Sequence, residues 1–511
     1  MRSTTDLTRL TEMTLGETLA DAARRFPDRV ALLWEDVSLT YAEWDVRANQ
    51  LARLLVELGV GEGARVALWM DKRIDVPVAF LGVARARAVS VPVNFKLPAR
   101  AQRYQLEAFG VEAIITQRSH LNAVEAVADA LPGPARIIVV DGDADDAPHT
   151  PAAAAAALPS TPPDRRPQAD DVVYLNMTSG TTGRPKAGIT THAMIQWNTR
   201  SSIETLAFGD DERFLCMFSV FAHPHELFCR PLAVGGCAVL VDSLNVRAVA
   251  RAIEAYRVTW VMAVPSFYEM LSEHAEGSGA DLSCLRMLEA GGAHLPPEAY
   301  ARLAATLAAP LVPVWGSTET SGVAVAQRRG AECTPGSMGY VAEHYRVKVI
   351  RDDGQPAGPG EIGEMYVRGP AVVAGYWGDD EETAKHFDGG WYRTDDLVRQ
   401  GEDGELRFCA RRSEMMKIGG IRVFPLEIEL ALRKHPAVAD AVVVRAEETL
   451  RGEIARAVII PRAGAEISIR ALRLHCREHL ALYQVPRMIE LWDEIPRTPA
   501  GKVDKAAIIA T

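Results

Sequence analysis

Residues 172–192 read V-V-Y-L-N-M-T-S-G-T-T-G-R-P-K-A-G-I-T-T-H, a short apolar run followed by a loop of hydroxyls, glycines and one lysine. This composition indicates a phosphate-binding loop, because hydroxyls donate to phosphate oxygens, glycines let backbone N–H groups come close and a lysine adds positive charge. A plain turn between two strands is the alternative. The candidate phosphate contacts are Thr178, Ser179, Gly180, Thr181, Thr182, Gly183 and Lys186.

The order of these residues differs from that of the nucleotide-binding P-loop. That loop has its lysine directly after the second glycine and then a serine or threonine, whereas Arg184 and Pro185 separate Gly183 from Lys186 here. The run T-S-G-T-T-G-R-P-K instead resembles the signature loop of adenylate-forming enzymes, which include acyl- and aryl-CoA synthetases, peptide-synthetase adenylation domains and beetle luciferases. The resemblance extends over roughly residues 15–505.

Length and composition predict a soluble protein of more than one domain. The chain has 511 residues, which exceeds what one hydrophobic core usually covers, and its 48% hydrophobic and 24% charged residues are ordinary for globular proteins. The net charge of −11 argues against a nucleic acid or an anionic membrane surface as a partner.

The cysteines and the N-terminus predict a cytoplasmic protein. The seven cysteines are scattered, with no C-x-x-C pair and no histidine at zinc spacing, which indicates reduced thiols. Asp6 and Arg9 break up the N-terminal sequence, so the continuous apolar run of a signal peptide is not expected there. No apolar run reaches the length of about 18 residues that a membrane span requires.

The pattern of apolar residues alternates between helix and strand. Apolar residues at helical spacing occupy residues 15–26 and 41–58, and the strand-like A-R-V-A-L-W-M at 64–70 leads into another helical segment. Such alternation predicts a parallel sheet with helices on both faces. Residues 151–171 contain a six-alanine run and five prolines, which predicts a surface linker; a short alanine-rich helix is the alternative.

Residues 213–228 lie where the family has the wall of its acid pocket. The stretch S-V-F-A-H-P-H-E-L-F resembles the amino-acid adenylation motif S-F-D-A-S-V-W-E-L-F, but Phe221 stands where those domains hold an aspartate for the α-ammonium. A buried ammonium without a carboxylate partner is strongly unfavourable, so an ordinary α-amino acid is a poor candidate substrate. Ala222 and His223 are similar to the aryl-acid activating members, which implies that His223 approaches the substrate carboxylate. Ordinary core packing of the histidines is the alternative.

Two further motifs combine a strand-like run with a polar loop: R-M-L-E-A-G-G-A-H-L-P and V-P-V-W-G-S-T-E-T-S-G. The alternative is that the glycines only form turns and that the glutamate is simply exposed to solvent. The resemblance implies that the acid is bound by Gly291, Gly292 and Gly322, the adenine by Trp315, a phosphate by Thr318 and magnesium by Glu319.

The stretch Y-R-T-D-D-L resembles the family's Y-R-T-G-D-L, whose last aspartate binds both ribose hydroxyls; this residue is Asp396. Asp395 replaces the family's glycine, and because aspartate tolerates a positive φ we expect the turn to persist. Its extra negative charge could weaken ATP binding. Residues 408–418, F-C-A-R-R-S-E-M-M-K-I, resemble the family's hinge, which implies that Arg411 contacts the nucleotide and that Glu414 is the hinge acid.

The resemblance predicts an α/β fold with two domains. Residues 1–411 would form a large N-terminal adenylation domain of parallel and mixed sheets with helices and a β unit, and residues 412–511 a small, mobile α+β domain. Gly419 and Gly420 would line the entrance for a thiol, and a hairpin turn is a compatible interpretation. The loop I-P-R-T-P-A-G-K-V-D-K carries Lys502, which the resemblance implies is the catalytic lysine.

The activity implied is ATP- and Mg²⁺-dependent conversion of a carboxylic acid to an acyl-adenylate, followed by transfer to a thiol. Lys502 would stabilise charge between the carboxylate and the phosphate, and the small domain would rotate about the hinge before thiol attack. Residues 423–427, V-F-P-L-E, look like the acyl-CoA synthetase version and favour coenzyme A. A phosphopantetheine on a carrier protein acting in trans is the alternative, and a non-catalytic nucleotide sensor is less consistent with the motifs. The sequence does not determine which acid is used, whether the protein forms a homodimer, or in which pathway it acts.

Overall fold

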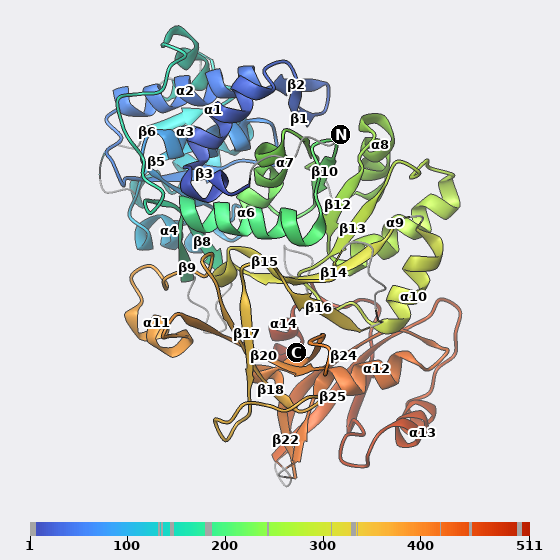
Figure 1. The fold of residues 1–511 in the computed structure, drawn as a ribbon. Helices are drawn as coiled ribbons and strands as arrows, with labels where there is room; N and C mark the ends of the chain where they lie inside the picture. Colours follow the sequence, from blue (N-terminus) through green and yellow to red (C-terminus); the bar gives the residue numbers. More distant parts are fainter. Residues whose placement is uncertain are drawn as a thin grey trace. The chain divides into compact units, whose positions relative to one another are not determined.

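The structure is a computed structural model, and it describes residues 7–130, 133, 136–143, 148–178, 186–242, 245–307, 309–328, 334, 336–419, 421–448, 452–497 and 503–511 (Figure 1). The chain divides into two compact units. The first unit consists of Met1–Cys333, Gly339–Arg346 and Val367–Tyr392, and the second of Thr334–Met338, Val347–Tyr366 and Arg393–Thr511. The domain boundary after residue 411 stays a prediction.

The first unit contains a seven-stranded sheet in the order β7-β6-β5-β3-β4-β8-β9. All neighbours in this sheet run parallel except β8 and β9, which form an antiparallel pair. The strands are β3 (Arg65–Trp69), β4 (Val89–Pro92), β5 (Val111–Thr116), β6 (Arg136–Val139), β7 (Thr150–Pro151), β8 (Val172–Thr178) and β9 (Lys186–Thr191). The helices between them are α3 (Asp75–Arg85), α4 (Ala99–Ala108) and α5 (Leu121–Glu125).

Two N-terminal helices start at capping boxes that the sequence encodes locally. Thr14 caps α1 (Leu15–Arg25) together with Glu17, and Thr40 caps α2 (Tyr41–Glu57) together with Glu43. Each pair satisfies two backbone N–H groups that a helix start would otherwise leave without a partner. Both helices, and the alternation that predicted a parallel sheet, are confirmed.

The alanine-rich segment lies against α2 rather than serving as a free linker. Residues Ala152–Ala157 form a 3₁₀ helix. Gln50 donates to the carbonyl of Leu158, Asn49 to that of Ser160, and Arg53 to those of Thr161 and Pro162. The segment is mostly exposed, as predicted, but the polar face of α2 fixes its path.

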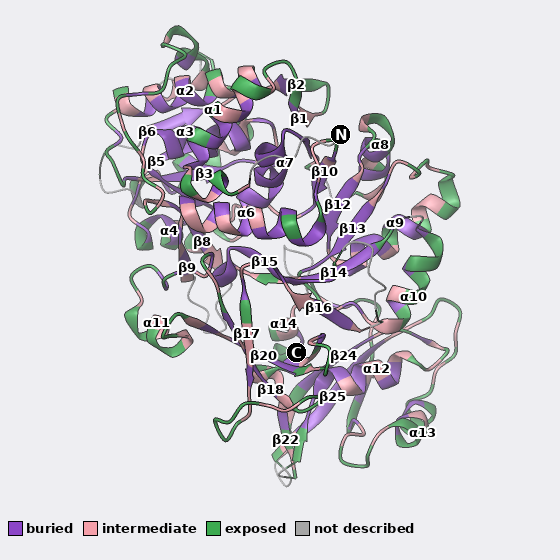
Figure 2. Cartoon of the chain, viewed as in Figure 1, coloured by how far each residue is buried: buried purple, intermediate pink, exposed green. Residues whose placement is uncertain are grey.

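A second sheet of the first unit has the order β14-β13-β12-β10-β11-β1-β2, parallel except for the β1–β2 hairpin. Its strands are β1 (Val30–Trp34), β2 (Val37–Thr40), β10 (Arg213–Cys216), β11 (Cys237–Leu240), β12 (Trp260–Ala263), β13 (Met287–Ala290) and β14 (Leu311–Ser317). β15 (Gly322–Ala326) pairs antiparallel with β14 and with β16 (Ser337–Val341). The central strands are buried, whereas α8 to α10 expose their outer faces (Figure 2).

The helices of this part are α6 (His192–Leu206), α7 (Cys229–Val234), α8 (Val246–Tyr256), α9 (Pro265–Ser278), α10 (Pro297–Thr306) and α11 (Asp380–His386). The short strand β19 (Phe387–Asp388) follows α11 and pairs with the start of β20. Parallel strands buried by helices on both faces explain why β10 to β13 read as nearly continuous apolar runs.

The second unit has its own apolar core between helices and a small sheet. The sheet order is β24-β25-β26, and buried residues of α12, α13, β24 and β25 form one cluster. Its elements are β17 (Arg346–Ile350), β18 (Ile362–Arg368), β20 (Trp391–Gln400), β21 (Leu406–Arg411), β22 (Met416–Ile418), β23 (Ile421–Val423), α12 (Pro425–Arg433), β24 (Val438–Glu448), β25 (Gly452–Pro461), α13 (Ile469–His479), β26 (Met488–Leu491) and α14 (Lys505–Ala510). The predicted α/β class with a small α+β C-terminal part is confirmed.

Within the described ranges, no helix has both the length and the apolar character that a bilayer crossing demands.

Candidate active site

The signature loop joins β8 to β9. Ser179, Gly180, Thr181, Thr182 and Gly183 lie outside the described residues, as does the side chain of Thr178. The loop's lysine is described. Lys186 Nζ forms an ion pair with Glu382 of α11 and lies 5.6 Å from the ring centroid of Tyr376. The hydrogen bond from Lys186 is the main reason why the pKa of the Glu382 carboxyl is lowered.

Tyr376 also reaches the glutamate of the second motif. Its hydroxyl donates to Glu319 Oε1 at 2.7 Å, and Glu319 is only 7% exposed. No hydrogen bond to Glu319 Oε2 is formed within the described ranges. The carboxylate is therefore held in one orientation by Tyr376 while one of its oxygens keeps its acceptor capacity. A single fixed carboxylate of this kind fits the oxygen preference of Mg²⁺.

The loop strand and the second motif are in direct contact. Gly188 of β9 forms an antiparallel bridge with Tyr376, and a Cβ atom at Gly188 would lie 3.1 Å from Thr318 Cγ2. Val373 N–H donates to the carbonyl of Glu319 at 2.9 Å. Three segments that are far apart in sequence thus bring Lys186, Thr318 and Glu319 together. Trp315, half-buried on β14 opposite Val325, precedes this cluster in the chain.

The predicted wall of the acid pocket contains two histidines with different environments. His225 is buried and satisfied: its Nε2 donates to the carbonyl of Ser321 at 3.0 Å, and its Nδ1 accepts from Tyr174 at 2.9 Å. Burial lowers its pKa, and core packing describes it fully. His223 is only half-buried, and its Nδ1 lies 3.2 Å from the side-chain nitrogen of the buried Asn176.

Phe221 packs its ring edge-to-face on Phe95, with ring centroids 5.7 Å apart and an interplanar angle of 90°. The nearest carboxylate in sequence, Glu226, is 3% exposed, and its Oε2 accepts from Arg230 Nη2 at 2.9 Å. Burial opposes ionisation of Glu226, but the charge of Arg230 nevertheless lowers its pKa. Arg230 therefore already neutralises this carboxylate.

Arg230 also contacts a second buried carboxyl. Its Nη1 donates to Glu289 Oε1 at 2.5 Å, and Trp260 Nε1 donates to the same oxygen. Burial raises the pKa of Glu289. One arginine thus faces one carboxylate that ionises readily and one that resists ionisation, so the buried charges balance without a further cation.

The three predicted glycines of the acid pocket occupy different environments. Gly322 has φ +122°, and a Cβ atom there would lie 2.2 Å from Glu226 Oε1 and 2.6 Å from Asn198 Oδ1. A Cβ at Gly291 would lie 2.8 Å from Val314 Cγ2. Gly292 is exposed with φ +77°, as expected of a turn. Packing alone explains the glycine at position 322, and the roles of these residues in acid binding stay predictions.

The predicted ribose ligand lies in the second unit. Asp396 on β20 is 1% exposed, pairs across the strands with Arg411 of β21, and has its Oδ1 2.7 Å from Arg411 Nε. Asp395 lies within β20 and has φ +59°, the left-handed region that aspartate tolerates better than most residues, as expected where it replaces a glycine.

The predicted hinge acid, Glu414, forms an ion pair with a lysine of α14. Glu414 lies in the 3₁₀ helix Arg412–Glu414, and its Oε2 is 2.6 Å from Lys505 Nζ, which also lies 3.5 Å from Glu429. Burial opposes the charge of Lys505, but Glu429 and Glu414 raise its pKa. Gly419 has φ +59° at the end of β22, as a hairpin turn requires. Gly420 and the catalytic candidate Lys502 lie outside the described residues.

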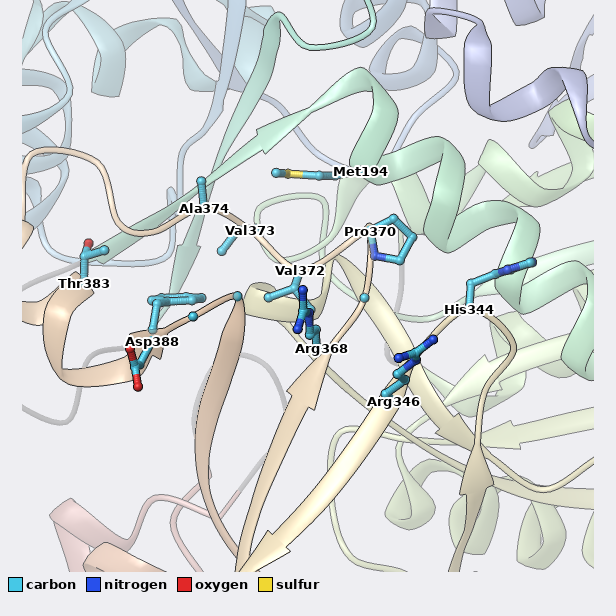
Figure 3. A pocket seen from close by; sticks show the side chains of 14 residues that line it. Met194, His344, Arg346, Arg368, Pro370, Val372, Val373, Ala374, Thr383 and Asp388 are labelled. Atoms are coloured by element: carbon cyan, nitrogen blue, oxygen red, sulfur yellow. The ribbon is translucent and has the colours of Figure 1, made fainter.

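A cavity of about 770 Å³ lies in the first unit, beside the segment that contacts Glu319. Met194, Val372 and Val373 form an apolar part of its lining, and Arg346, Arg368 and Asp388 contribute charged groups (Figure 3). None of the predicted site residues that the structure describes lines this cavity.

Tyr376 and Glu382, which hold Glu319 and Lys186, were not predicted from the sequence. The only signal in the sequence was the acidic run D-D-E-E after G-Y-W-G, and acidic residues at a helix start are common without any function.

Comparison with known proteins identifies the family. Residues 19–377 match the AMP-binding enzyme family and residues 427–502 the AMP-binding enzyme C-terminal domain. The chain is 33% identical to a feruloyl-CoA synthase of an Amycolatopsis species, covering 97% of this chain and 98% of the relative. It is 30% identical to an indoleacetate–CoA ligase of Aromatoleum aromaticum, covering 96% and 97%.

Solved structures with a similar fold include enzymes of this kind. The crystal structure of the anthranilate CoA ligase AuaEII in complex with anthranoyl-AMP superposes with a TM-score of 0.90 at 26% identity, covering 98% of this chain and 97% of that one. The protein therefore belongs to the AMP-binding enzyme family, and the predicted membership of the adenylate-forming superfamily is confirmed.

Proposed function

We propose that this protein converts an aromatic carboxylic acid into its coenzyme A thioester by way of an acyl-adenylate. As a family member with CoA ligases as relatives, it is an AMP-forming acid–thiol ligase. The observation that carries the aromatic assignment is the predicted pocket wall, where Phe221 replaces an aspartate and Glu226 is neutralised by Arg230. The names of the feruloyl, indoleacetate and anthranilate enzymes support the same class of acid.

In the first half-reaction a carboxylate oxygen of the acid attacks the α-phosphorus of ATP. A C(O)–O–P bond forms, the bond to the β-phosphate breaks and pyrophosphate leaves. Lys502 would offset charge between the two reacting anions, and the loop hydroxyls would hold the triphosphate. Lys186, which is paired with Glu382, would share its charge with the phosphates on ATP binding.

Magnesium supplies charge neutralisation of the polyphosphate when it is bound. Glu319 would hold the ion through Oε2, because Tyr376 occupies Oε1 and fixes the carboxylate. Asp396 would accept hydrogen bonds from the ribose hydroxyls, with Arg411 beside it.

In the second half-reaction the thiolate of coenzyme A attacks the acyl carbon. The C–S bond forms, the C–O bond to AMP breaks and AMP leaves. Gly419 and Gly420 would line the thiol's approach, after a rotation about the hinge at Glu414. The same chemistry on a carrier-protein phosphopantetheine is the second candidate, supported by the broader family. We place the reaction in the cytoplasm, consistent with the six free cysteines among the described residues.

The test is ATP–pyrophosphate exchange with matched acids, followed by a choice of acceptor. We expect 3-phenylpropanoate to be adenylated at least about 100-fold better than phenylalanine, because the ammonium would be buried without a free carboxylate and cation–π attraction recovers only part of that cost. Coenzyme A should then release AMP and form a thioester. Preference for the amino acid, or release of AMP only with a carrier protein, would contradict the proposal.

A further inference from the structure

Helix α13 carries two histidines and a glutamate on its last turns, in the order H-C-R-E-H from His475 to His479. Residues four apart lie on the same side of a helix, so the two imidazoles are neighbours. Their ring centroids are 4.3 Å apart. One ligand atom each from His475, Glu478 and His479 lies within 4.8 Å of the others.

Hydrogen bonds to backbone carbonyls determine which nitrogen of each imidazole ring carries a proton. His475 Nε2 lies 2.8 Å from the carbonyl oxygen of Ala431, and His479 Nδ1 lies 2.9 Å from the carbonyl oxygen of His475. A carbonyl can only accept, so these two nitrogens carry the protons. The lone pairs are therefore on His475 Nδ1 and His479 Nε2. Histidines that bind metals commonly donate their other nitrogen to a carbonyl in this way.

Two other candidate ligands nearby are excluded. His435 has its ring centroid 5.1 Å from that of His475, but its Nδ1 accepts from the N–H of Ala437, which places its proton on the other nitrogen. Cys476 is 0% exposed and belongs to the apolar core of this unit, whereas Glu478 and His479 are exposed at the surface. The ligand set in the described part of this helix is therefore His475, Glu478 and His479.

We propose that these three side chains bind a divalent transition-metal ion such as Zn²⁺. Two neutral imidazoles and a carboxylate form a set that zinc accepts, whereas magnesium requires oxygen ligands. Bonds of about 2.0–2.2 Å in a tetrahedron place ligand atoms about 3.3–3.5 Å apart. Metal binding would require the exposed Glu478 and His479 side chains to rotate so that this gap closes. The ion would clamp the end of α13 and, through His475 and Ala431, tie it to α12.

The test uses the full-length enzyme after chelator treatment, with Mg²⁺ kept in excess in every sample. Zn²⁺ is titrated by calorimetry, and Co²⁺ absorption reports nitrogen ligation. We expect one ion per chain at this site, and His479→Asn should weaken binding about 10- to 100-fold. The same variant should lose the Zn²⁺-dependent rise in unfolding temperature that binding to the folded state produces.

His435→Gln is the matched control, since this ring borders the site without a lone pair facing it, and it should bind as the wild type does. Glu478→Gln should weaken binding without changing the unfolding temperature of the metal-free protein. Equal Zn²⁺ affinity in the wild type and in the double variant His475→Gln/His479→Asn would overturn the proposal, as would no binding by the wild type. If the double variant does not fold, the exposed His479→Asn variant alone decides.

Discussion

Asp395 and Asp396 are neighbours in sequence but differ in environment. Asp396 is buried beside Arg411, whereas Asp395 is partly exposed, has a left-handed backbone conformation and lies 3.9 Å from Arg393. We expect Asp396→Asn to raise the KM for ATP about 10- to 100-fold, because ribose hydroxyls lose a charged acceptor worth about 1.5–3 kcal/mol. The KM for the acid should stay constant in steady-state kinetics.

Asp395→Asn is the matched control for this variant. It keeps a side chain that tolerates a positive φ and removes one negative charge near the nucleotide. The KM for ATP should therefore stay the same or fall. An unchanged KM in Asp396→Asn with a raised KM in Asp395→Asn would show that the ribose ligand is assigned one residue too late.

The tight packing around Gly322 can be tested by adding a single methyl group at this position. Gly322→Ala would place its Cβ against Glu226 and Asn198 at a φ of +122°, so we expect a loss of about 2–4 kcal/mol in stability. Thermal unfolding measures this loss. Gly277→Ala in α9 is the control, since a Cβ there meets nothing within 4 Å, and it should be neutral or stabilising by about 0.4–1 kcal/mol. Equal unfolding temperatures would contradict the packing described around Gly322.

Local chemistry explains which residues were predictable from the sequence. The positive φ at Asp395 is compatible with the conformational tolerance of aspartate, and Phe221 stands out because it replaces a charged residue in a recognisable motif. Tyr376 contacts Glu319 and Glu382 contacts Lys186, almost 60 and 200 residues away in the sequence. No local pattern encodes such contacts, so a single sequence cannot reveal them.

At the level of elements, Lys505 connects the start of α14 with Glu414, the predicted hinge acid, and with Glu429 of α12. Lys502 lies three residues before it. We expect Lys505→Met to lower kcat for adenylation about 10- to 100-fold, because a misplaced catalytic group is costly. The KM values for ATP and the acid should change little. Stopped-flow measurement of pyrophosphate release gives the rate.

Lys505→Arg should restore much of this rate, since it keeps the positive charge between the two carboxylates. Lys434→Ala is the control, as Lys434 is exposed at the end of α12. A Lys505→Met enzyme with normal kcat would mean that the ion pair does not position the loop of Lys502.

Helices and strands were predicted where the local signal is strong. The capping boxes of α1 and α2 and the alternating pattern of residues 15–116 are encoded locally. The position of the alanine-rich segment is not, because it depends on hydrogen bonds from side chains of α2 that are about 110 residues away. Pairing such as β1 with β11 likewise joins residues about 200 apart.

At the scale of the whole molecule, the chain has two units, each with its own apolar core. The length and the family motifs predict two domains, and the predicted site residues occur in both units: Lys186, Thr318 and Glu319 in the first, Asp396, Arg411 and Glu414 in the second.

The most direct test of this two-step chemistry is the rate of each half-reaction in Lys502→Ala. Adenylation is followed by pyrophosphate release and thioester formation by mixing supplied acyl-adenylate with coenzyme A. We predict that adenylation falls about 100-fold or more, the scale of losing one preorganised charge-stabilising group, while thioester formation stays near the wild-type rate. An equal loss in both half-reactions would contradict the account.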